Sequence, residues 1–191
     1  IVRDILKIVD TSKEAKKIIK KGEILVDKKP RKDHKYPVGL FDVVSIPRIK
    51  KHYRIVPSKQ GLKLVEISEK ESSTKVCRID NKTVVKGGVI QLNLHDGRNI
   101  LVKKDVYKTG DSVVIELPTQ KILQHLKLDT NVLAILTGGQ NIGTLVKVKK
   151  VVKTRSREPN KVVCEREGKE LTAIKDYVFV VGKEKPVVTV S

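Results

Sequence analysis

Apolar positions in the first 47 residues recur at helical spacing and then in short strand-like runs. The first helical run consists of Ile1, Ile5, Ile8 and Val9. A second helix should begin at Thr11, because Glu14 three residues later completes a capping box, and Gly22 fits its C-cap. Two short strands are expected at 24–26 and 42–46. This pattern predicts a small α+β unit over residues 1–47.

The pattern changes after Pro47. Residues 48–58 are basic and contain a second proline, which predicts a linker or an edge strand. Residues 59–127 should form a central β-domain, with a tight hairpin turn at Asp96 and Gly97. Its last strand should end near residue 117, and Pro118 suits the first turn of a short helix that continues to about Leu126.

Residues 128–191 again consist of short apolar runs separated by turns. The strands expected there are 131–136, 143–152, 161–165 and 177–181. Such spacing is typical of a small β-barrel. The predicted fold class is therefore multidomain and mostly β. Its units are the α+β module (1–47), a linker (48–58), the central β-domain (59–127) and a small barrel (128–191).

Composition adds a strong positive charge to this picture. The 191 residues include 41 Lys and Arg against 22 Asp and Glu, a formal net charge of +19. An excess of this size opposes compaction, so a polyanionic partner is the simplest reason for it. Aromatic residues make up only 3%, which weakens any mechanism that needs stacking platforms. Because no apolar run approaches the roughly 20 residues of a membrane span, no membrane partner is expected.

Two basic clusters are the candidate nucleic-acid contacts. One places five lysines on the second predicted helix, where like charges destabilise the helix unless phosphates neutralise them. The other, from Lys147 to Arg157, spans the end of the predicted strand 143–152 and the loop after it, and it contains no acidic residue. Either cluster could instead be a solvated surface. The residues expected to contact RNA are Arg3, Lys13, Lys16, Lys17, Lys20, Lys21, Lys28, Arg31, Lys147, Lys149, Lys150, Lys153, Arg155 and Arg157.

Residues capable of catalysis or metal binding are scattered. The four histidines have no metal-ligand spacing, and Cys77 and Cys164 are expected to be reduced thiols. His95 and Asp96 could suggest acid–base chemistry, but the hairpin turn explains that pair. The glycine-rich stretch 138–143 lacks the Lys and Ser/Thr of a phosphate-binding loop. We therefore expect no catalytic residue, no metal and no cofactor.

Several segments, in the same order along the chain, resemble one ribosomal protein family. Residues 11–15, 22–28 and 39–44 resemble the small RNA-binding module first described in bacterial ribosomal protein four. Three further segments resemble the S4e family of the archaeal and eukaryotic small ribosomal subunit: a signature at 89–99, a KOW motif at 138–143 and a C-terminal strand at 177–182. The resemblance extends over essentially the whole chain.

The resemblance implies a non-enzymatic protein that binds small-subunit rRNA, contacts neighbouring ribosomal proteins and supports subunit assembly and translation in the cytoplasm. Lys and Arg would bind phosphates and recognise folded rRNA by its shape. The alternatives are an rRNA-modifying enzyme of the pseudouridine-synthase kind and a KOW-type transcription elongation factor. The sequence departs from the family at Thr144, where a basic residue is common, and it lacks the family's basic N-terminal extension, so part of the rRNA contact surface is expected to be missing.

Overall fold

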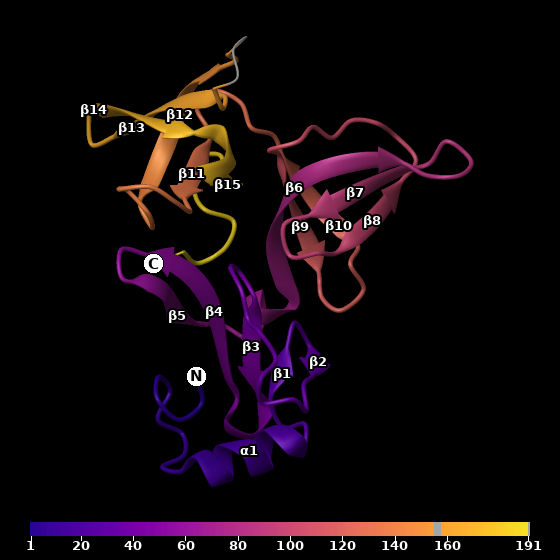
Figure 1. Cartoon of the computed structure of the whole chain (residues 1–191), viewed down its shortest axis with the longest axis vertical. Helices are drawn as coiled ribbons and strands as arrows, with labels where there is room; N and C mark the ends of the chain where they lie inside the picture. Colours follow the sequence, from indigo (N-terminus) through magenta and orange to yellow (C-terminus); the bar gives the residue numbers. More distant parts are fainter. Residues whose placement is uncertain (155–157, 191) are drawn as a thin grey trace.

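Three five-stranded antiparallel sheets make up most of the computed structural model, which describes residues 1–154 and 158–190 (Figure 1). The first sheet, in the order β2-β1-β3-β4-β5, contains β1 (Leu25–Val26), β2 (Lys29–Pro30), β3 (Val43–Ile46), β4 (Lys51–Ser58) and β5 (Gly61–Ile67). The second, β10-β9-β6-β7-β8, contains β6 (Thr74–Val84), β7 (Ile90–Leu94), β8 (Asn99–Val102), β9 (Ser112–Glu116) and β10 (Ile122–Leu126). The third, β14-β13-β12-β11-β15, contains β11 (Leu133–Leu136), β12 (Leu145–Val152), β13 (Lys161–Arg166), β14 (Lys169–Ile174) and β15 (Val178–Gly182). The predicted class, mostly β with a small α+β module, is confirmed.

The first residues of the chain form turns and not the first predicted helix. The backbone N–H groups of Ile5 and Leu6 both donate to the carbonyl of Ile1, and Lys7 then adopts a left-handed φ of 49°. The predicted helix would have been too short to be stable in water, and the left-handed conformation of Lys7 prevents the helical turn from continuing.

Of the predicted apolar run, Ile8 and Val9 pack against the first sheet, whereas Ile1 and Ile5 are exposed. Val2, which was not part of that run, is buried. The helical spacing therefore predicted burial only in part and did not predict the turns.

The α-helix found among the described residues, α1 (Ser12–Lys20), begins where the sequence indicates and ends one residue earlier. The Thr11 hydroxyl accepts a hydrogen bond from the Glu14 N–H, and the Glu14 carboxylate accepts one from the Thr11 N–H, both at 3.2 Å. This reciprocal capping box satisfies two backbone donors that the helix leaves free. At the other end Lys21 is the C-cap residue, and Gly22 with φ of 77° follows it, one position later than expected.

The basic segment after Pro47 is neither a linker nor an edge strand. A 3-10 turn (Pro47–Ile49) leads into β4, which is hydrogen-bonded to β3 on one side and to β5 on the other. Residues 52–57 of β4 are buried. The sequence misled because the guanidinium of Arg54 is fully buried and pairs with Glu71, so this charge does not face solvent. The first sheet thus continues past both of the expected boundaries at residues 47 and 58.

The second sheet contains the expected hairpin between β7 and β8, with Gly97 at φ of 82° in its turn. The short helix expected after Pro118 is absent from this described segment. A turn closed by the Gln120 N–H and the Glu116 carbonyl returns the chain into β10, which pairs with β9. Proline favours such turns as well as helix starts, and the pairing with β9 decides between them.

The third sheet matches the sequence expectation in four strands, each within two residues of its predicted bounds. Strand β14 was not anticipated, because only three of its six residues are apolar and it lies at the edge of the sheet. The KOW resemblance of residues 138–143, which form the turn before β12, remains a prediction. Among the described residues, no helix is both long and apolar enough to cross a membrane.

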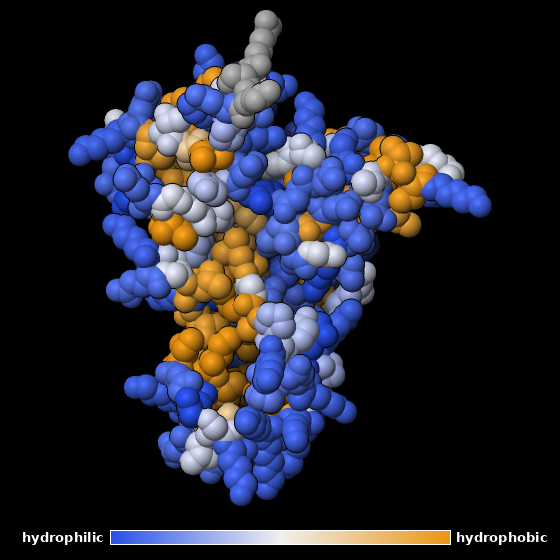
Figure 2. All heavy atoms as spheres, in the orientation of Figure 1, coloured by the Kyte–Doolittle hydropathy of each residue, from blue (hydrophilic) through white to orange (hydrophobic). Residues whose placement is uncertain are grey.

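The largest of three buried hydrophobic clusters in the described part of the chain joins all three sheets. The largest buried cluster contains most of the inward-facing residues of the third sheet together with Phe41 and Val56 from the first and Val76 and Val114 from the second. At its centre the rings of Phe41 and Phe179 lie 4.5 Å apart. The hydrophobic surface in Figure 2 continues between the third sheet and β4 and β5 below it. The sheets are consequently packed against one another and are not independent domains joined by linkers.

Candidate nucleic-acid interface

The helix α1 presents a basic ridge at one end of the molecule (Figure 1). We call this the α1 ridge, and its residues are Lys13, Lys16, Lys17, Lys20 and Lys21. All five side chains are exposed, and within the described residues none of them forms an ion pair. The opposite face of the helix packs Ile18 and Ile19 against the core of the first sheet. The fold therefore holds these lysines outward on a rigid element, as the helical spacing predicts.

The remaining predicted contacts of the first module have partners within the protein. The Lys28 ammonium donates to the Ser72 hydroxyl at 2.7 Å and is half-buried. The Arg31 guanidinium lies 4.1 Å from the centre of the Tyr36 ring. The Arg3 guanidinium donates to Asp4 at 2.6 Å. These cations are therefore less available to an external anion than those of the α1 ridge.

The second basic cluster lies on β12, where buried Val146 and Val148 alternate with exposed Lys147 and Lys149. The pairing register between β12 and β13 shifts after Val148, and the adjacent Lys150 is exposed as well. Lys149 is paired with the Glu165 carboxylate at 2.6 Å and holds the pKa of Glu165 below its usual range. We call the exposed residues Lys147, Lys149, Lys150 and Lys153 the β12 cluster. Arg155 and Arg157 lie outside the described residues.

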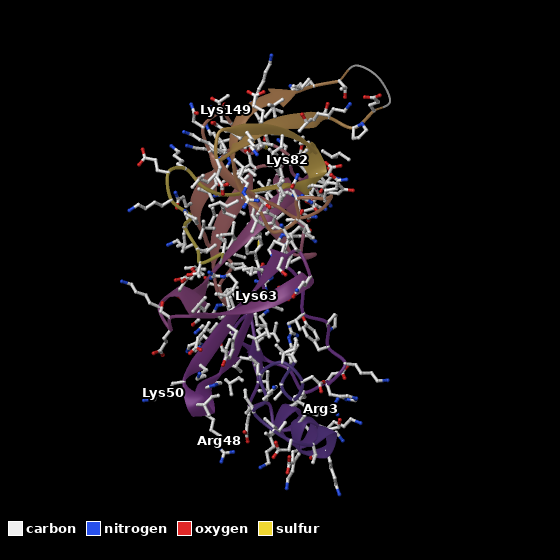
Figure 3. The ribbon with its side chains drawn as sticks, turned by 90° about the vertical axis from the view of Figure 1, so that its left-hand side faces the viewer. Arg3, Arg48, Lys50, Lys63, Lys82 and Lys149 are labelled. Atoms are coloured by element: carbon white, nitrogen blue, oxygen red, sulfur yellow. The ribbon has the colours of Figure 1, made fainter. Side chains whose placement is uncertain are left out.

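The α1 ridge and the β12 cluster lie at opposite ends of the molecule, so they do not merge into one patch (Figure 1). Further basic residues lie between them in the view of Figure 3, where the labels from top to bottom are Lys149, Lys82, Lys63, Lys50, Arg3 and Arg48. Lys50, Lys59 and Lys63 are exposed and were not predicted. A weak signal was available, because residues 59–63 contain two lysines and no acidic residue.

Buried charges join the first sheet to the second. The Lys75 ammonium contacts the carboxylates of Asp27 at 2.9 Å, Asp42 at 2.5 Å and Asp96 at 2.7 Å, and Arg98 also pairs with Asp27 and Asp96. We call these five residues the junction network. Burial alone would lower the pKa of Lys75, but Cys77 and the three carboxylates outweigh it and raise that pKa. Burial would likewise raise the pKa of Asp96, but Lys75 outweighs it and holds that pKa low. Lys75 and Asp96 therefore stabilise each other's charged forms.

Cys77, His95 and Asp96 are close enough to suggest a metal or catalytic site, since their ligand atoms lie within 4.8 Å of one another. The Asp96 carboxylate is already neutralised by Lys75 and Arg98. His95 uses both ring nitrogens, because Nδ1 accepts from the Arg78 N–H and Nε2 lies 3.2 Å from the Leu40 carbonyl. Burial raises the pKa of the Cys77 thiol well above its usual value, so the nucleophilic thiolate is disfavoured. This group fits structural support between the sheets better than chemistry.

Comparisons with known proteins agree on one family. Residues 49–122 match the ribosomal family S4e, and residues 4–44 match the S4 domain. The chain is 49% identical over 191 residues to the small ribosomal subunit protein eS4 of Methanothermobacter thermautotrophicus, covering 99% of this chain and 78% of the relative. It is 46% identical to the eS4 protein of Methanocaldococcus jannaschii, covering 98% of this chain and 80% of the relative.

A solved structure shows the same fold. The crystal structure of the 30S ribosomal protein S4e from Thermoplasma acidophilum superposes with a TM-score of 0.82 at 29% sequence identity. The superposition covers 96% of this chain and 92% of the other. The likeness therefore includes all three sheets as well as the segments that match at the sequence level.

Proposed function

Because this chain belongs to the ribosomal protein family S4e, we propose that it binds small-subunit rRNA as a structural constituent of the ribosome. The family consists of structural ribosomal proteins and not of enzymes, so neither the pseudouridine-synthase nor the elongation-factor alternative is supported. The proposal includes contacts with neighbouring ribosomal proteins and a place on cytoplasmic ribosomes. The relatives named as small ribosomal subunit proteins support both.

The observation that carries RNA binding is the α1 ridge. Phosphate contacts supply most of the sequence-independent affinity for nucleic acid, and lysines without a carboxylate partner are free to make them. Lys13, Lys17 and Lys21 follow one another at four-residue intervals, a rise of about 6 Å each along the helix. The capping box and the packed apolar face fix this helix before RNA arrives, so little conformational entropy is lost on binding. The ridge is thus suited to recognising a folded RNA backbone by shape.

The β12 cluster supplies a second, weaker surface in this proposal. Lys149 must exchange its Glu165 partner for phosphate, which reduces the net gain from that contact. Lys147, Lys150 and Lys153 are exposed and form no ion pair within the described residues. The α1 ridge is therefore expected to contribute more affinity than the β12 cluster.

The test compares triple substitutions of equal charge. Replacement of Lys13, Lys17 and Lys20 by Gln should weaken binding to small-subunit rRNA by about 1 kcal/mol or more and reduce the salt dependence of binding. The comparison is the same change at Lys147, Lys150 and Lys153, which should cost less. The control is the same change at the exposed Lys103, Lys104 and Lys121, which lie in loops next to strands of the second sheet, and it should cost little. RNA binding by the unaltered chain that is absent, or insensitive to salt, would refute the proposed function.

A further inference from the structure

A groove of about 640 Å³ lies between the first and third sheets. One wall is the end of the β4–β5 hairpin, with Pro57, Lys59 and Lys63. The other wall belongs to the third sheet and includes Lys147 and Arg166. We call this groove between the two sheets the junction groove. It is separate from the α1 ridge, and its only residue in the β12 cluster is Lys147.

The walls of the groove are held at a fixed separation by Gly143. A Cβ atom at Gly143 would lie 2.7 Å from the Ser58 Cα and 2.8 Å from the Pro57 carbonyl oxygen, too close for any side chain. The glycine also has a φ of 77° and donates its N–H to the Leu136 carbonyl at 2.7 Å. Backbone therefore meets backbone at the base of the groove, and the groove exists without a ligand to shape it.

Positive charge lines both walls. Lys59 and Lys63 come from the hairpin, and Lys147 and Arg166 face them from the third sheet. Within the described residues, the three lysines form no ion pair. The two carboxylates that line the groove are engaged, since Glu165 lies 2.6 Å from Lys149 and Glu167 lies 3.4 Å from Arg166. The exposed Arg166–Glu167 pair is weak enough to yield to a phosphate.

Apolar side chains line the groove between its cations, and we call them the floor. Val56 and Val146 are each only 2% exposed, so the accessible apolar surface comes from half-buried Ile142 and from Leu145, which is 38% exposed. A duplex presents phosphates and sugars on its outside, with no apolar face to cover such a floor. An unpaired nucleotide presents an apolar base face as well as a phosphate. Its base can leave the stack and pack on aliphatic groups while its phosphates reach the cations.

We propose that the junction groove binds an unpaired segment of RNA, with bases on the aliphatic floor and phosphates at Lys59, Lys63, Lys147 and Arg166. The inference rests on the proposed function, since it names a further site and a form of RNA for the same partner. It assigns a binding role to the β4–β5 hairpin, which the sequence alone did not suggest.

The first experiment measures affinity of the full chain for small-subunit rRNA across a range of salt. Lys59→Gln with Lys63→Gln changes two exposed side chains that have no described partner, so folding should be retained. Each phosphate contact to a single strand contributes about 0.7 to the slope of log affinity against log salt concentration. Loss of two contacts should therefore reduce the magnitude of this slope by about 1.4. The matched control, Lys103→Gln with Lys104→Gln, should leave the slope unchanged.

The second experiment identifies what occupies the groove. Both native thiols are fully buried, so a cysteine introduced as Lys59→Cys can be labelled selectively with a reagent that cleaves nearby RNA. Cleavage at nucleotides that are unpaired in the free rRNA supports the proposal. Cleavage only within duplex regions, or a double Gln variant with wild-type affinity and slope, overturns it while leaving the proposed function intact. Failure of the unaltered chain to bind rRNA overturns both.

Discussion

Replacement of Lys75 by Met removes the central cation of the junction network while keeping a side chain of similar length. The residue Lys75 is 0% exposed, and its ammonium contacts three carboxylates that are themselves nearly buried. Without it, Arg98 alone must balance Asp27 and Asp96, and Asp42 has no cation left in the network. Breaking a buried ion pair by removing one partner costs about 3–5 kcal/mol. We expect a loss of stability in that range at pH 7.

Urea denaturation followed by circular dichroism measures this loss. The control is Lys51→Met, which breaks an exposed pair with Glu66 of 3.3 Å and should cost less than about 1 kcal/mol. The pH dependence of stability provides a second test. In the unaltered chain Lys75 holds the pKa of Asp96 low, so this stabilisation is present at neutral pH and is lost as pH falls through that lowered pKa.

The variant should respond to acid in the opposite direction. Without Lys75, the effect of burial on Asp96 is no longer outweighed by that ammonium, so the pKa of Asp96 in the folded state rises, and its protonation relieves repulsion as pH falls from about 7 towards 5. The difference in unfolding free energy between the two proteins should therefore shrink on acidification. A loss below about 1 kcal/mol at pH 7, or a loss that is equal at both pH values, would refute the assignment of the network as a stabilising junction.

Two further predictions concern single side chains. Thr11→Ala removes the capping hydroxyl of α1 and should destabilise the protein by about 1 kcal/mol in urea denaturation, whereas Thr11→Ser should be nearly neutral; equal stability of all three proteins would contradict the capping role. Burial raises the pKa of Cys77 well above normal and that of Cys164 to about 11, so a thiol reagent at pH 8 should modify both only when urea unfolds the chain; rapid modification of the native protein would contradict their burial.

The elements that could be predicted from sequence are those specified by neighbouring residues. The start of α1 follows from Thr11 and Glu14, and the β7–β8 hairpin follows from Gly97, because each signal acts within a few positions. The α1 ridge was predictable for the same reason, since helical spacing alone places its lysines together. Local signals of this kind do not depend on the rest of the fold.

What sequence could not predict depends on residues brought together from far apart. Lys75 is separated by 48 positions from Asp27 and by 21 from Asp96, so no spacing rule connects them. Counted by composition, Lys75 and Arg54 belong to the surface charge that suggests RNA binding, yet both are buried and paired inside the protein. Burial also explains why β4 was mistaken for a linker, and the junction groove needs two sheets before it exists.

Strand β4 gives the molecule the properties of a rigid spacer. Its start belongs to the sheet that supports α1, and its end meets Gly143 backbone to backbone beneath the β12 cluster. Two RNA segments held at the two ends of such a body have a separation set by the protein. Occupying one end raises the effective concentration of the other segment without any new contact, but only for RNA folds in which the two segments lie at that separation. If both basic surfaces bind RNA as proposed, the protein favours RNA conformations in which the two bound segments lie at that separation.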